Sequence, residues 1–170
     1  MTDRRTGFTA ASSGYLASEM AQISELKLPA QRDYIVVAKR AAGAIGTVAG
    51  FDVDAVDDLT IAVSQAFENA CSCLERSGFL TGHIRIAFKQ EKDGIEVTVR
   101  SGVSREDEIT ARHQVRAQQV REDAVRRGAE EAAATELALR LMGLFVDQSS
   151  YRLDERTGGL RVRLTKYRAS

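Results

Sequence analysis

The chain has 170 residues, a length that suits one compact domain and is too short for two domains of ordinary size. Hydrophobic residues make up 44% and aromatic residues only 6%, which predicts one core built mostly of aliphatic side chains. The 24 basic residues balance the 24 acidic ones, and this zero net charge excludes a general attraction to nucleic acid while leaving room for a local basic patch. Because no hydrophobic run resembles a secretory signal or a membrane span, we expect a cytoplasmic protein without membrane contacts.

The N-terminal part predicts a tail, a strand and a helix, in that order. Residues 1–23 hold Gly, Ser and Thr without periodicity, so we expect a flexible tail followed by a single domain over 24–170. Apolar and polar residues alternate over 24–28, as in a short strand. Pro29 suits the entry to a helix over 31–48, where apolar residues recur at helical spacing.

The clearest helix signal covers residues 55–76. Asp52 and Asp54 are suitable N-caps. The apolar stripe repeats at intervals of three and four residues and comprises Leu59, Ala62, Val63, Ala66, Ala70, Cys73 and Leu74. Cys71 and Cys73 are the only cysteines; a disulfide between them would be strained, and a four-ligand zinc site would lack partners. We therefore expect two reduced thiols in or near the helix core.

A hairpin and a charged segment follow this helix. Residues 82–89 and 94–101 alternate as strands do, and Asp93-Gly94 between them is a hairpin turn signal. Residues 104–134 are dense in charges of both signs and poor in large apolar residues. Such a segment has little to bury, so we expect a mobile helical excursion there.

The C-terminal part completes the fold class. Residues 135–146 are apolar enough for a buried helix, and two further alternating segments, 149–154 and 160–167, flank a turn at 157–159. Grouped helices between runs of strands predict an α+β, two-layer domain with one sheet covered by helices on one face. A parallel doubly wound sheet would require strict alternation of strands and helices, which this chain lacks.

Residues 57–70, Asp-Asp-Leu-Thr-Ile-Ala-Val-Ser-Gln-Ala-Phe-Glu-Asn-Ala, resemble the first helical motif of the anti-sigma-factor serine kinases. Residues 26–30 are similar to the opening strand of that family, and residues 164–167 to its closing strand. The resemblance covers about residues 26–167 apart from the charged excursion. It implies a GHKL, or Bergerat-type, histidine-kinase-like ATPase fold with a mostly antiparallel sheet.

Two amides carry the resemblance to a nucleotide site. Gln65 and Asn69 are four residues apart, so they lie on one helix face, away from the apolar stripe. The resemblance implies that Asn69 holds the magnesium ion of Mg-ATP, a task for which an amide oxygen is suited, and that position 65 carries the general base. Spacing alone favours a merely solvated face, whereas the flanking resemblance favours a ligand role for Asn69.

The chain departs from the family at three motifs. Gln65 stands where a glutamate is expected, and an amide cannot act as a general base, whose loss costs about 10²- to 10⁴-fold in rate. Ser101, followed by Gly102, stands where an aspartate should accept a hydrogen bond from adenine. The glycine-rich loop that cradles phosphates is replaced by residues 134–139, with a negative charge at Glu136.

These departures predict that ATP binding and kinase activity are weakened or lost. Four arginines could receive phosphates instead, although charged runs are usually solvated: Arg100, Arg140 and, in the charged excursion, Arg112 and Arg116. The resemblance implies an anti-sigma-factor-like regulator that sequesters a sigma factor and is countered by an anti-anti-sigma, STAS-type partner, with a homodimer allowed and no direct nucleic-acid contact. Two alternatives stay open: an active ATP-dependent serine/threonine kinase, and a histidine-kinase-like ATPase signalling module with another partner.

Overall fold

A computed structural model describes residues 22–77, 79, 81–103, 133–134, 136–154 and 159–168. Its five strands are β1 (Ile23–Pro29), β2 (His83–Glu91), β3 (Gly94–Gly102), β4 (Gln148–Leu153) and β5 (Leu160–Tyr167). The helices are η1 (Arg32–Tyr34), α1 (Ile35–Val48), α2 (Val53–Arg76) and a shorter helical stretch over 136–142.

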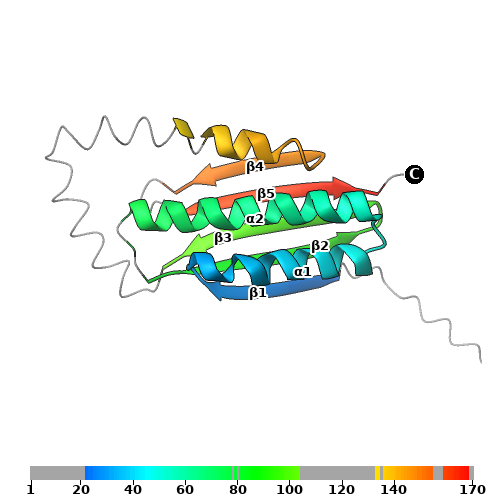
Figure 1. Ribbon diagram of the computed structural model, residues 1–170, viewed down its shortest axis with the longest axis horizontal. Helices are drawn as coiled ribbons and strands as arrows, with labels where there is room; N and C mark the ends of the chain where they lie inside the picture. Colours follow the sequence, from blue (N-terminus) through cyan, green and yellow to red (C-terminus); the bar gives the residue numbers. More distant parts are fainter. Residues whose placement is uncertain are drawn as a thin grey trace, which may run out of the picture.

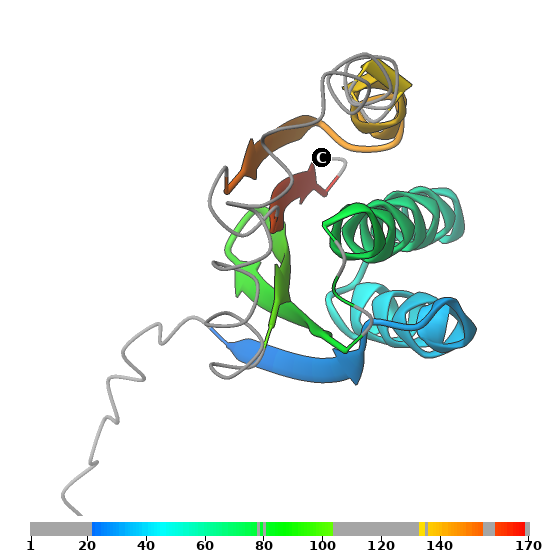
Figure 2. The same cartoon turned by 90° about the vertical axis from the view of Figure 1, so that its left-hand side faces the viewer.

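The strands form one sheet in the order β1-β2-β3-β5-β4, and every neighbouring pair is antiparallel. The helices lie side by side on one face of this sheet, with α2 between α1 and the stretch over 136–142 (Figures 1 and 2). We call this the helix face and the opposite one the outer face. The predicted two-layer α+β fold is confirmed. Among the helices of the described ranges, none is long and apolar enough to span a membrane.

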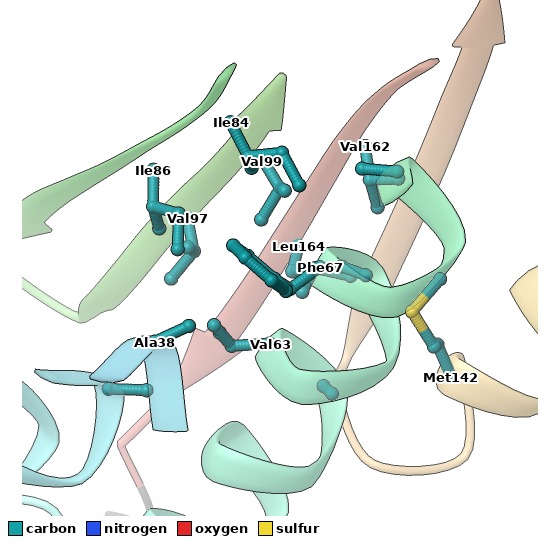
Figure 3. Packing of buried hydrophobic residues seen from close by; sticks show 14 of the residues in the cluster. Ala38, Val63, Phe67, Ile84, Ile86, Val97, Val99, Met142, Val162 and Leu164 are labelled. Atoms are coloured by element: carbon teal, nitrogen blue, oxygen red, sulfur yellow. The ribbon is translucent and has the colours of Figure 1, made fainter. Parts of the chain in front are cut away.

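The core lies between α2 and the sheet. Phe67 points from α2 onto the central strands, where Val97, Val99 and Leu164 surround it (Figure 3). All of these side chains are almost completely buried. The core is aliphatic apart from a few phenylalanines, as the composition predicts, and its centre coincides with the resembling motif on α2.

The start of α1 differs from the sequence prediction. Pro29 is the last residue of β1, not a helix entry; η1 intervenes, and α1 begins at Ile35. The physical reason is the position of β1 at the sheet edge, because a proline that cannot donate to a ladder is tolerated in an edge strand. The start of α2 agrees with prediction, since Asp52 accepts a hydrogen bond from the Ala55 amide at 2.8 Å.

The remaining predicted elements are found with small shifts. The β2–β3 hairpin turns before Gly94, where a Cβ atom would overlap the carbonyl oxygen of Lys166, so this position requires glycine. The last helix is shorter than expected and ends at residue 142. Ile23, assigned to the tail, belongs to β1. The rest of the predicted tail up to residue 21, and the excursion up to residue 132, lie outside the described residues.

Candidate nucleotide site

The flank of α2 that carries Gln65 and Asn69 faces β5 rather than α1. Asp58 lies on the same flank two helical turns before Gln65, and it accepts a hydrogen bond from Lys166 of β5 at 2.9 Å. Thr60, on the opposite flank, lies against α1. The two amides therefore lie on the flank of α2 that is turned toward β5, away from the flank that packs against α1.

Lys166 fixes this side of the helix to the sheet. Its side chain is only 15% exposed, and its ammonium group also donates to the carbonyl oxygen of Phe145 at 3.1 Å. One partly buried cation thus joins β5, the start of α2 and the segment after the last helix. This is a structural role for a residue of the closing-strand motif.

Asn69 is half-buried, and its Nδ2 atom is buried without a hydrogen-bond partner in the described part of the chain. An unpaired buried polar group costs about 1–3 kcal/mol, so it is retained where a ligand can satisfy it. The other polar atom of the same amide, Oδ1, is an oxygen of the kind that suits magnesium as a ligand. Asn69 therefore fits the metal role that the resemblance implies.

Gln65 is exposed one turn before Asn69. Within the described α2, the neighbouring carboxylate of Glu68 does not take over its position. Glu68 lies on another side of the helix and faces Arg32, at 4.0 Å from its guanidinium. Arg32 is held mainly by Glu75, at 3.1 Å, whose hydrogen bond raises the pKa of the guanidinium. Glu68 thus belongs to an ion-pair cluster beside η1 and does not lie on the flank of α2 that carries Gln65.

Ser101 is buried, and its hydroxyl is engaged within the sheet. Its Oγ accepts a hydrogen bond from the Leu160 amide at 2.7 Å and lies 3.2 Å from the Leu160 carbonyl oxygen, to which it donates. The side chain thereby links the ends of β3 and β5. Gly102 makes room for His83, since a Cβ atom there would lie 2.9 Å from the imidazole ring. Because the Ser101 hydroxyl already bonds to Leu160, it is less suited to accept a hydrogen bond from adenine than a free acceptor would be.

The phosphate candidates are separated by the sheet. Arg100 is exposed on the outer face, because alternate strand residues point to opposite faces. A phosphate held near Asn69 is therefore out of its reach. Arg140 donates to Glu136 at 2.7 Å, and both side chains are exposed. This ion pair partly compensates the negative charge that replaces the glycine-rich loop. It leaves the guanidinium less available to a phosphate.

A groove of about 550 Å³ lies elsewhere, and the sequence analysis did not anticipate it. Ser101 and Gly102 border it, whereas Gln65 and Asn69 do not, so the four predicted residues are not brought together there. Its other walls include Arg85, Arg152 and Arg161. Outward-facing arginines in several strands were visible in the sequence. Their alignment was not, because strand order and register cannot be read from alternation alone.

Comparison with known proteins identifies the family. Residues 28–166 match the family profile described as histidine kinase-like ATPase domain. The chain is 30% identical over 142 residues to serine-protein kinase RsbW of Listeria innocua, and this alignment covers 84% of the chain and 85% of that protein. The same figures hold for RsbW of Listeria monocytogenes serotype 4b strain CLIP80459. RsbW of Bacillus subtilis is 33% identical over 79 residues, covering 46% of the chain and 41% of that protein. With the resemblance over residues 26–167 thus confirmed, the chain belongs to the histidine kinase-like ATPase domain family.

Proposed function

We propose that the chain is an anti-sigma-factor-like regulator that sequesters a sigma factor and is countered by a STAS-type anti-anti-sigma protein. Its ATP binding and kinase activity are weakened or lost. The observation that carries the second statement is the exposed amide of Gln65 at the base position, with Glu68 drawn to Arg32. The RsbW relatives support the first statement, because they align over most of the chain.

Phosphoryl transfer depends mainly on positioning the phosphates and neutralising their charge. When Mg-ATP is bound, the magnesium ion supplies most of that neutralisation. The chain's own contribution would be the Asn69 amide as a metal ligand. The ion pair of Glu136 with Arg140, at 2.7 Å, occupies the junction where phosphate-binding backbone amides are expected. Restoring a carboxylate at position 65 alone therefore leaves the phosphates poorly held.

The first test is capture combined with phosphate transfer. The full chain should retain a sigma factor of its own bacterium in a binding assay, and should transfer no detectable radiolabel from ATP to a serine of the cognate anti-anti-sigma protein. The Gln65→Glu variant should also transfer none, although a base alone is worth about 10²- to 10⁴-fold. RsbW of Listeria innocua with its own partner is the positive control.

Each outcome of this test has a distinct meaning. Label transfer by the unmodified chain would replace the proposal with the active-kinase alternative. Transfer by Gln65→Glu alone would show that the phosphates are held well and that only the base is missing. Failure to bind any sigma factor, with a folded protein, would contradict the sequestration proposal itself.

A second prediction concerns Asn69. Because its buried amide has an unpaired atom, Asn69→Leu should raise the free energy of unfolding by up to about 1 kcal/mol, measured by urea denaturation. The same change should abolish whatever heat of Mg-ATP binding the unmodified chain shows in calorimetry. Gln65→Leu, on the same flank but exposed, is the matched control and should change stability by less than about 0.5 kcal/mol. A clear loss of stability in Asn69→Leu would show that the amide has a structural role instead.

A further inference from the structure

The outer face of the sheet carries one basic residue from each of its five strands in a single cross-strand row. The register pairs Lys27 with Arg85, Arg85 with Arg100, and Arg100 with Arg161, which in turn pairs with Arg152. We call these five residues the basic row. Neighbouring strands are about 4.8 Å apart, so the row extends about 19 Å across the sheet.

Such an arrangement opposes the stability of the sheet. Like charges directly opposite each other in neighbouring strands are destabilising. Among the described residues, Arg85 has a carboxylate partner, Glu25, at 3.2 Å, while no carboxylate is in ion-pair contact with the other four members of the row. The outer-face Glu96 instead faces Arg163, at 3.7 Å. The described sheet therefore leaves most of the row's positive charge uncompensated.

The basic row also borders a concave surface. Its four arginines contribute to the walls of the groove of about 550 Å³, next to His83. Burial lowers the pKa of His83, and the charges of Lys27, Arg85 and Arg100 lower it further. The positive charge of the row thus disfavours protonation of the imidazole. Asp154, which carries the opposite charge, lines the same groove.

We propose that the basic row is a docking site for an acidic segment of a protein partner, laid across the strands of the outer face. An extended segment presents the side chains of alternate residues on one side, about 7 Å apart, so three carboxylates span most of the row. The planar guanidinium group forms paired hydrogen bonds with a carboxylate, which favours arginine at such sites. This surface lies on the opposite side of the sheet from Asn69, so the inference goes beyond the proposed function and does not depend on it.

Two other occupants agree less well with the surface. Single-stranded nucleic acid is usually held by aromatic side chains on which the bases stack. On the outer face, the nearest neighbours of the basic row along each described strand are the residues two positions before and after it. None of these neighbours is Phe, Tyr or Trp. A second copy of the chain would place one basic row against another. Charge complementarity therefore favours an acidic protein segment.

The test uses the full chain and a fluorescent 12-residue peptide in which glutamate alternates with serine, followed by anisotropy at low and physiological salt. Arg100→Gln combined with Arg161→Gln should weaken binding at least about tenfold, since hydrogen bonds to charged groups are lost. Lys39→Gln combined with Arg40→Gln removes the same charge from exposed positions of α1 and should weaken it less than about twofold. In the unmodified chain, bound peptide should raise the pKa of His83, measured by NMR, because carboxylates offset the repulsion from the row.

The remaining outcomes overturn the proposal. If the two double variants weakened binding equally, the peptide would be held by general charge attraction and not by the basic row. If a single-stranded oligonucleotide of equal charge bound more tightly than the peptide, the row would be a nucleic-acid site. If inorganic tripolyphosphate displaced the peptide completely and bound with the same affinity, the row would be a site for small anions. A dimer that the Arg100 and Arg161 changes dissociate, seen by sedimentation, would make a second copy the occupant. Sigma-factor capture is measured separately, so its failure leaves this result unaffected.

Discussion

Phe67→Ala should lower the free energy of unfolding by about 3–5 kcal/mol, because it removes a large side chain from the centre of the core. Phe67 is fully buried, and its neighbours across α2 and the central strands are aliphatic (Figure 3). The backbones of β3 and β5 are held by their ladder, so the walls cannot collapse to fill the space. Domains of this kind have about 5–15 kcal/mol of stability, so the variant should be marginally folded.

The measurement is urea unfolding followed by circular dichroism. With a slope of about 2 kcal/mol per molar urea, the midpoint should fall by about 2 M. Phe67→Leu keeps most of the volume and should cost less than about 1.5 kcal/mol. Val53→Ala, on the same helix but 76% exposed, should change stability by less than about 0.5 kcal/mol. A loss below about 1 kcal/mol for Phe67→Ala would mean that the α2–sheet contact is not the centre of the core.

The sequence predicted this part of the fold well because its signals were local. The apolar stripe of α2 has one period, its cap at Asp52 uses a side chain that reaches a nearby amide, and the hairpin at Gly94 needs a residue without Cβ. These features depend on residues close together in the chain. Element order and the motif over residues 57–70 then sufficed to identify the fold.

Features that depend on distant pairing were predicted poorly. Pro29 looks like a helix start until β1 is known to be an edge strand. Ser101 looks like an available acceptor until Leu160 is brought beside it. Arg100 looks like a candidate for binding phosphate until its strand position is known to turn it to the outer face. In each case the deciding fact is the register between strands far apart in sequence, which alternation does not encode.

The same helix carries the centre of the core and the two amides of the candidate nucleotide site. Phe67 and Asn69 are two residues apart on α2 and point in different directions, one into the core and one toward β5 and the last helix. Packing therefore keeps the Asn69 amide in position whether or not catalysis is retained. Glutamine at position 65 is likewise compatible with the fold, because it is exposed and lies away from the core side of α2.

The thiols of Cys71 and Cys73 should be nearly inert in the folded protein. Both are free and buried, on α2 residues that do not face each other. Burial, with a smaller contribution from Glu75, raises the pKa of Cys71 to about 11. Burial also raises the pKa of Cys73, partly opposed by Arg76, whose guanidinium lies 3.1 Å from its sulfur. The thiolate, which is the reactive form, is therefore scarce at both positions.

At pH 8 a thiol of pKa about 8.5 is roughly one quarter thiolate, whereas one of pKa about 11 is about 0.1% thiolate. The higher basicity of such a thiolate recovers about one order of magnitude in nucleophilicity, but burial also blocks the approach of a reagent. We therefore expect Cys71 to react with Ellman's reagent at least about 10²-fold more slowly than glutathione at pH 8, and Cys73, which is also buried, to react more slowly than glutathione. In unfolding concentrations of urea both should react at the rate of an exposed thiol. Cys71→Ala and Cys73→Ala assign each reaction, and native reactivity within tenfold of glutathione at Cys71 would show that this end of α2 opens without global unfolding.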